Sequence, residues 1–212
     1  MSLRLFLLRH GETEFSKTGG YCGDLDPELT AEGLEMAQQF ADAYRTMKWE
    51  AAYVSPMRRT IATARPICES VGLEMQLRDG LTEIRYGTWE GLTQEYVRAH
   101  YAADYEKWLA EPAWNAPTGG ETATQIASRA IPVIAEILTA HSSGNVLIVS
   151  HKATLRILLC NLLGIDLGRY RDRIQFLTAS VSVIKFDEHG PLMETLGDRS
   201  HLSAALRNLP GT

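Results

Sequence analysis

The sequence predicts an α/β fold of three layers, in which helices cover both faces of a mostly parallel central sheet. Short apolar runs typical of strands alternate along the chain with longer helix-like stretches, as in sheets whose parallel strands are joined by helices. Two further runs near the C-terminus can pair as a hairpin, which would add an antiparallel edge. No repeat or linker interrupts the 212 residues, a length that fits a single domain over residues 1–212.

Six apolar runs have the length and composition of strands. The first is continuous rather than alternating, as expected for a strand that is covered on both faces. The last two are separated by residues 187–191, which include glycine and proline and so favour a turn. In chain order, the predicted strands are residues 3–8, 51–54, 73–77, 145–149, 181–186 and 192–196.

Helix starts are marked by residues that cap a helix N-terminus. Ser55 is followed by a proline, which suits a first turn, and Thr122 is followed by Gln125, as in a capping box. Gly72 is expected to end the helix that starts at Ser55, and Pro132 is expected to kink the helix that starts at Thr122. Helices are thus predicted to start at Thr30, Ser55, Thr122 and Ser150, with two polar helices within residues 93–110.

The charge and the cysteines exclude several classes of function. A formal net charge of −5 leaves no basic surplus to coat a nucleic-acid backbone, so no nucleic acid is expected as a partner. The apolar run at the N-terminus is too short for a signal segment or a membrane span, so no membrane is expected either. Three widely spaced cysteines without a C-x-x-C pair predict free thiols in a reducing cytoplasm.

Charged side chains and imidazoles follow several of the predicted strands. Arg9 and His10 come directly after the first strand, and Glu83 lies in the loop after the third. His151 and Lys152 follow the fourth strand. Because ligands of open α/β sheets bind beyond the carboxyl ends of the strands, we expect these side chains to share one site.

Two helix N-termini at this edge carry cations, although helix N-termini favour anions. Arg58 and Arg59 lie in the first turn of one predicted helix, and His151 and Lys152 begin another. The unpaired N–H groups and the dipole of a helix N-terminus attract negative charge. Cations at both helix N-termini therefore predict that an anion binds between the two helices, and a phosphate dianion would fit.

Six segments resemble, in residue type and in order, the motifs of the histidine phosphatase superfamily, which includes the cofactor-dependent phosphoglycerate mutases. The first segment, L-R-H-G-E-T, is similar to the family signature. The resemblance covers roughly residues 3–165, and it places the family's pocket arginine on Arg59 rather than on Arg58. The six segments are residues 8–13, 23–30, 55–60, 83–87, 119–122 and 150–156.

The resemblance implies a phosphatase in which His10 takes up the phosphoryl group. An attacking ring nitrogen must be unprotonated, so His10 should be neutral, with its other nitrogen held by a carbonyl. Arg9 and Arg59 can offer forked donors to phosphate oxygens, and His151 can add a donor or a positive charge. Glu83 is expected to protonate the leaving oxygen and then to activate water.

Other residues are candidates for substrate binding. Ser16 stands where the family usually has asparagine, and its hydroxyl can still donate to phosphate. Lys152 could reach a substrate anion, and His201 could fold over the mouth of the site to contact the leaving group. The candidate substrate-binding residues are Ser16, Cys22, Gly23, Tyr86, Lys152 and His201.

A phosphatase, a mutase and a non-catalytic phospho-ligand-binding module are the functions that the sequence leaves open. The mutases have a lysine where this chain has Gln94, which favours hydrolysis of a small phosphomonoester, and phosphoserine is a first candidate. The six histidines show neither H-x-x-x-H nor H-E-x-x-H spacing, so neither a metal nor a cofactor is expected. Residues 162–163 and the hairpin could form a homodimer interface, or they could belong to the core.

Overall fold

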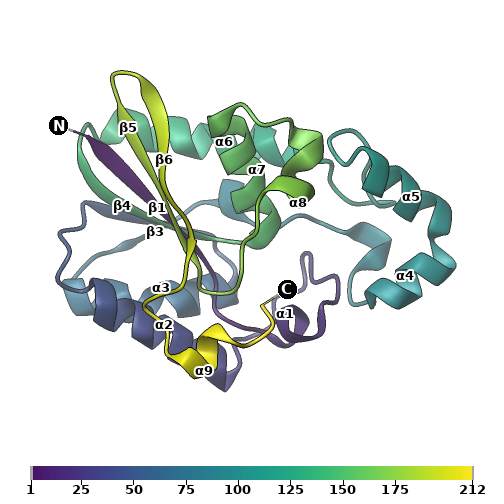
Figure 1. Ribbon diagram of the computed structural model, residues 1–212, viewed down its shortest axis with the longest axis horizontal. Helices are drawn as coiled ribbons and strands as arrows, with labels where there is room; N and C mark the ends of the chain where they lie inside the picture. The colour runs from purple at the N-terminus through teal and green to yellow at the C-terminus, as the bar shows by residue number, and fades with distance from the viewer. Residues whose placement is uncertain (1, 212) are drawn as a thin grey trace.

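The computed structural model describes residues 2–211, so both ends of the domain predicted over residues 1–212 lie outside the described residues (Figure 1). Its centre is one six-stranded sheet in the order β3-β2-β4-β1-β5-β6. The pairs β1–β4, β4–β2 and β2–β3 are parallel, and β1–β5 and β5–β6 are antiparallel. The strands are β1 (Leu3–Arg9), β2 (Ala51–Val54), β3 (Met75–Leu77), β4 (Gly144–Ser150), β5 (Val181–Asp187) and β6 (Gly190–Asp198).

Helices cover both faces of this sheet, which confirms the predicted three-layer α/β fold with an antiparallel hairpin at one edge (Figure 1). The side chains of β1 alternate between two cores: Leu5 and Leu7 pack with α6 and α7, whereas Phe6 and Leu8 pack with α2 and α3. The helices are α1 (Glu14–Thr18), α2 (Ala31–Tyr44), α3 (Arg58–Val71), α4 (Gln94–His100), α5 (Ala102–Ala110), α6 (Ala123–Ala140), α7 (Lys152–Leu163), α8 (Tyr170–Arg173) and α9 (Ala204–Arg207).

Two of the predicted helix caps are confirmed. The Thr30 hydroxyl accepts a hydrogen bond from the backbone N–H of Gly33, and Thr122 forms a capping box with Gln125. Pro132 lies inside α6, which continues through it over 18 residues. None of the helices within residues 2–211 is both long enough and apolar enough to cross a bilayer.

The two predicted serine caps are wrong. Helix α3 starts three residues after Ser55, and its N-cap position is occupied by Met57. Helix α7 has His151 at its N-cap, one residue after Ser150. The physical reason is that both hydroxyls bind elsewhere: the Ser150 hydroxyl donates to the carbonyl of Leu81 at 2.6 Å, and the Ser55 hydroxyl hydrogen-bonds an imidazole.

A cluster of aromatic side chains lies beside the main sheet, where α4 and α5 extend away from it (Figure 1). Tyr21, Trp89 and Trp108 form its centre, and the Trp89 and Trp108 rings meet edge to face at 5.4 Å between centroids. The two short helices were predicted within residues 93–110. They bury only one face, and this face forms a wall near the carboxyl ends of the strands.

The loop after β1 is held by a close approach between two backbones. A Cβ atom on Gly33 of α2 would lie 2.2 Å from the carbonyl oxygen of Glu12, so only glycine fits there. Substituting Gly33→Ala would raise helix propensity, yet we expect it to lower the free energy of unfolding by about 1–3 kcal/mol, because the loop must move. Urea unfolding measures the change.

The control is Ala43→Gly on the exposed face of the same helix. It should cost about 1 kcal/mol through helix propensity alone. If Gly33→Ala instead stabilised the protein by a similar amount, the backbone contact would not restrain the loop.

Candidate active site

The carboxyl ends of β1, β2 and β4 meet at one edge of the sheet. The backbone N–H of His10 donates to the carbonyl of Ser150 at 3.1 Å, and that of Ser55 donates to the carbonyl of Val149 at 3.0 Å. These bonds continue the parallel ladders by one residue beyond the strands. Residues that are far apart in the sequence, 10, 55 and 151, are thereby brought together, as the strand-end argument predicted.

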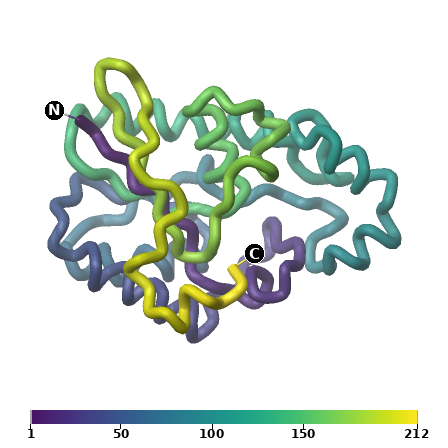
Figure 2. The backbone as a smooth tube through the Cα atoms, viewed as in Figure 1, coloured from purple at the N-terminus to yellow at the C-terminus, as the bar shows by residue number. Residues whose placement is uncertain are grey.

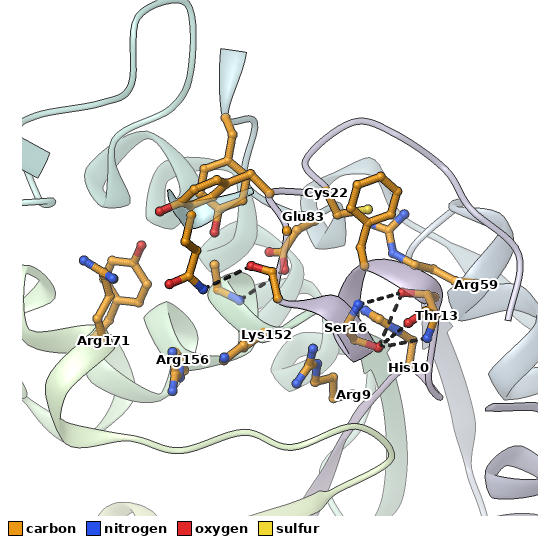
Figure 3. A pocket seen from close by; sticks show the side chains of 18 of the residues that line it. Arg9, His10, Thr13, Ser16, Cys22, Arg59, Glu83, Lys152, Arg156 and Arg171 are labelled. Atoms are coloured by element: carbon orange, nitrogen blue, oxygen red, sulfur yellow. Dashed lines mark hydrogen bonds between the residues drawn. The ribbon is translucent and has the colours of Figure 1, made fainter. Parts of the chain in front are cut away.

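A cavity of about 150 Å³ opens at this edge. Figure 3 shows side chains from the strand ends, from the loop after β1 and from α7 around it. Most of the predicted site residues line the cavity, including the predicted nucleophile and acid. These are Arg9, His10, Ser16, Cys22, Arg59, Glu83, Tyr86 and Lys152.

The His10 ring is buried and held in one tautomer. Its Nδ1 lies 2.7 Å from the carbonyl oxygen of Gly11. A carbonyl oxygen can only accept, so Nδ1 carries the proton and Nε2 keeps its lone pair. Burial, together with the positive charges of Arg59 and Arg9, holds the pKa of His10 well below its ordinary value. The ring is therefore neutral at physiological pH, the state that nucleophilic attack requires.

Arg59 lies on the first turn of α3 and is held by the loop after α1 and by His151. Its Nη1 donates to the carbonyl of Leu25 at 2.8 Å, and its Nη2 donates to the carbonyl of Gly23 at 3.4 Å. Its Nε donates to the Nδ1 atom of His151 at 3.2 Å. Gly23 thus contributes its carbonyl to Arg59 and does not line the cavity, although it was predicted to bind the substrate.

His151 is buried next to His10, with 5.2 Å between the ring centroids. Its Nδ1 accepts from Arg59, and its Nε2 lies 2.8 Å from the hydroxyl of Ser55, so Nε2 carries the proton. Burial and the charge of Arg59 hold its pKa well below the ordinary value. Of the two roles left open for His151, a donor or a positive charge, the structure therefore favours the neutral ring. Both ring nitrogens are engaged, and in this arrangement the ring orients Arg59.

Arg9 is buried at the end of β1 and is fixed by backbone carbonyls. Its Nη1 donates to the carbonyl of Phe176 at 2.7 Å and to that of Gly211 at 3.2 Å. Burial, with the charges of Arg156 and Arg59, lowers its pKa to about 9, although Glu83 opposes the shift. The guanidinium therefore stays charged at neutral pH and is fixed in direction before any ligand binds.

Glu83 occupies the N-terminus of α7. Its Oε1 accepts hydrogen bonds from the backbone N–H groups of Ile84 at 2.9 Å and Thr154 at 3.3 Å, and its Oε2 accepts from Ala153 at 3.3 Å. At α3, the backbone N–H of Arg58 donates to both carboxylate oxygens of Asp26 at 2.9 and 3.0 Å. The prediction that a bound phosphate supplies the missing anion at both helix N-termini is corrected, because carboxylates of the chain already cap both.

The other predicted substrate-binding residues differ in how they contact the cavity and their neighbours. Ser16 lines the cavity, but its hydroxyl donates to the carbonyl of Thr13 at 2.9 Å within a capping box of α1. Burial raises the pKa of the Cys22 thiol to about 11, so it stays protonated. Tyr86 and Lys152 face the cavity.

The expectation for His201 is corrected. Its ring packs edge to face against Phe40 and Tyr44, with centroid distances of 5.6 and 5.8 Å, and it does not line the cavity. Figure 2 shows the C-terminal segment running past α2, where the backbone N–H of Ser203 donates to the Gln39 side chain at 2.7 Å. The tail is held there by apolar packing of Leu202 and Leu206.

Several lining residues were not predicted. Arg156 lies one helical turn after Lys152 on α7, a spacing that could have indicated a shared face. Trp108, Tyr170 and Arg171 come from α5 and α8, and no local pattern places these elements over the strand ends. The cavity includes Gln94, whose amide donates to the carbonyl of Gly19 at 3.0 Å.

Residues 5–199 match the family model described as histidine phosphatase superfamily (branch 1). The chain belongs to the histidine phosphatase superfamily. Phosphoserine phosphatase 1 of Hydrogenobacter thermophilus is 33% identical over 94% of each chain. The adenosylcobalamin/alpha-ribazole phosphatase of Escherichia coli is 30% identical over 76% of this chain and 80% of its own length.

The fold of this superfamily is also found among solved structures. YhfR of Bacillus stearothermophilus superposes with a TM-score of 0.88 over 95% of this chain and all of its own, at 26% identity. The resemblance inferred from the six sequence segments is thus confirmed, as is the prediction of an enzyme, a phosphatase of the histidine phosphatase superfamily.

Proposed function

We propose that this histidine phosphatase superfamily member is a metal-independent hydrolase of small phosphomonoesters that works through a phosphohistidine on His10. The observation that carries the proposal is the His10 ring, neutral and oriented by Gly11, between two buried arginines. A phosphomonoester dianion repels nucleophiles, so the main task of a catalyst is positioning and charge neutralisation. Arg9 and Arg59 supply that charge, and Nε2 of His10 supplies the lone pair.

The reaction then proceeds in two displacements. As the phosphate dianion binds beside it, the Glu83 carboxylate takes up a proton from solvent. Nε2 of His10 attacks phosphorus, the ester P–O bond breaks, and protonated Glu83 gives its proton to the leaving oxygen. The resulting carboxylate takes a proton from a water molecule, which attacks the phosphohistidine. The P–N bond breaks, inorganic phosphate leaves, and Glu83 is protonated again. His151 is a positioning residue in this scheme, because it holds Arg59.

Phosphoserine-type compounds are the first substrates to test, because a relative that aligns over 94% of the chain is named a phosphoserine phosphatase. The name of the Escherichia coli relative adds alpha-ribazole phosphate to the panel. The decisive assay is phosphate release from p-nitrophenyl phosphate and from a panel of phosphomonoesters that includes L-phosphoserine. A non-catalytic module would bind these compounds without releasing phosphate.

Gln94 in the cavity favours hydrolysis over the mutase reaction, since the mutases have a lysine at this motif position. An NMR time course with 3-phosphoglycerate and the bisphosphate distinguishes the two activities. A phosphatase gives inorganic phosphate, whereas a mutase gives 2-phosphoglycerate.

Removal of divalent metal ions should leave the activity unchanged. The charges that neutralise the phosphate belong to arginines, which need no ion to act. Turnover of p-nitrophenyl phosphate by dialysed protein in excess EDTA should equal turnover in buffer. Loss of turnover in EDTA, with recovery on addition of one divalent metal, would contradict the proposed mechanism.

A further inference from the structure

Three cationic side chains line the cavity beyond the two arginines assigned to the phosphate. Lys152 and Arg156 come from α7, and Arg171 comes from α8. Figure 3 shows these three side chains on the opposite side of the cavity from Arg59. Spacing of four residues puts Lys152 and Arg156 on the same face of α7. We call Lys152, Arg156 and Arg171 the distal cations.

The distal cations have no acidic partner within residues 2–211. None of them forms an ion pair there, and the Nε atom of Arg156 is buried without a hydrogen-bond partner. Among the residues that the structure describes, Glu83 has the only carboxylate lining the cavity, and its oxygens already accept three backbone N–H bonds. Unpaired, partly buried cations are costly unless an anion completes the site.

Burial and neighbouring cations disfavour the charged forms of Lys152 and Arg156. Burial, followed by the charges of Arg9 and Arg156, lowers the pKa of Lys152 to about 7. Burial also lowers the pKa of Arg156. A bound anion nearby would stabilise the charged forms of both side chains.

Arg171 is fixed in direction before any ligand binds. Its guanidinium lies over the Trp108 ring, 3.7 Å from the ring centroid, and Trp108 belongs to the buried aromatic cluster. A guanidinium already held against a ring loses less conformational entropy when it binds a carboxylate.

We propose that the distal cations form a second anion subsite that binds a carboxylate on the leaving group. The preferred substrates are then phosphorylated carboxylic acids rather than phosphate esters of uncharged alcohols. The proposal rests on the proposed function, because it takes the phosphate to lie between Arg9 and Arg59. We take the anion to be a carboxylate, because the forked N–H donors of one guanidinium match its two oxygens.

A matched pair of unreactive phosphonates tests the subsite without turnover. 3-Phosphonopropionate and propylphosphonate have the same chain length and differ by one carboxylate, and their C–P bonds resist hydrolysis by a phosphatase. Isothermal titration calorimetry of the wild-type protein should give a dissociation constant for 3-phosphonopropionate at least about 10-fold lower than that for propylphosphonate, from one charge-assisted pairing.

Variants then show which side chains produce the preference for the phosphonate that carries a carboxylate. Arg156→Gln and Arg171→Gln should each reduce the ratio of the two dissociation constants to within about threefold of unity, because each removes one forked donor. Arg156→Lys, which keeps the charge, should retain part of the preference. The matched control is Arg173→Gln, an exposed arginine two residues from Arg171 that does not line the cavity, and it should keep the wild-type ratio. Thermal melting confirms that each variant is folded.

The possible results distinguish failure of the subsite proposal from failure of the proposed phosphate site. Equal binding of both phosphonates by the wild-type protein overturns the subsite and leaves the phosphate site intact. A preference that survives in both glutamine variants also overturns it. If neither phosphonate binds, the proposed function and the subsite fail together.

Discussion

Substituting His10→Ala should abolish turnover of p-nitrophenyl phosphate, with a loss of at least about 10⁴-fold in kcat. The variant removes the nucleophile while Arg9, Arg59 and Glu83 remain. Covalent phosphorylation of the protein should disappear with the activity. Intact-protein mass spectrometry after a rapid alkaline quench reports it, because a phosphohistidine survives base and is lost in acid.

The control for this variant is His189→Ala in the β5–β6 turn, whose side chain is 86% exposed. It should keep both the turnover and the phosphorylated species of the wild-type protein. A His10→Ala protein that still gave the acid-labile phosphorylated species would show that another residue takes up the phosphoryl group.

Substituting Glu83→Gln should lower kcat by about 10²–10⁴-fold on an alkyl phosphate such as L-phosphoserine. An alkoxide is a poor leaving group and depends on the proton that Glu83 gives, whereas p-nitrophenolate leaves without one. The loss on p-nitrophenyl phosphate should therefore be smaller. The comparison of kcat for the two substrates, in variant and wild type, measures the contribution of the proton.

Glu83 also caps α7, so part of any loss could come from a shifted helix. The amide keeps one acceptor oxygen but places an NH₂ group near the backbone N–H of Ala153. A urea unfolding curve measures that structural cost, and the two-substrate comparison separates it from chemistry. Equal losses on both substrates would contradict a role for Glu83 as proton donor.

Much of the fold follows from patterns that can be seen in the sequence. The apolar runs predicted strands at residues 51–54 and 145–149, and the structure has β2 at Ala51–Val54 and β4 at Gly144–Ser150. These strands can be predicted because the apolar residues that they bury are adjacent in the sequence. The serine caps were predicted wrongly because Ser55 and Ser150 are used by contacts to the distant residues His151 and Leu81, which no local pattern reveals.

In the candidate site, too, some features could be predicted from the sequence and others could not. The strand-end rule brought His10, Arg59 and Glu83 together, because topology alone sets which loops meet. The sequence left the ionisation of His151 open, since its neutral state depends on burial and on the charge of Arg59 nearby. Arg171 was missed, because α8 reaches the cavity only through tertiary packing.

The position of the phosphoryl group on the imidazole is the most direct test of this account. Because Nδ1 of His10 donates to the carbonyl of Gly11, only Nε2 can attack. NMR of the alkaline-quenched, ¹⁵N-labelled protein, correlated with ³¹P, distinguishes the two ring nitrogens. We expect a phosphoryl group on Nε2 of His10. A phosphoryl group on Nδ1, on His151 or on Cys22 would contradict it.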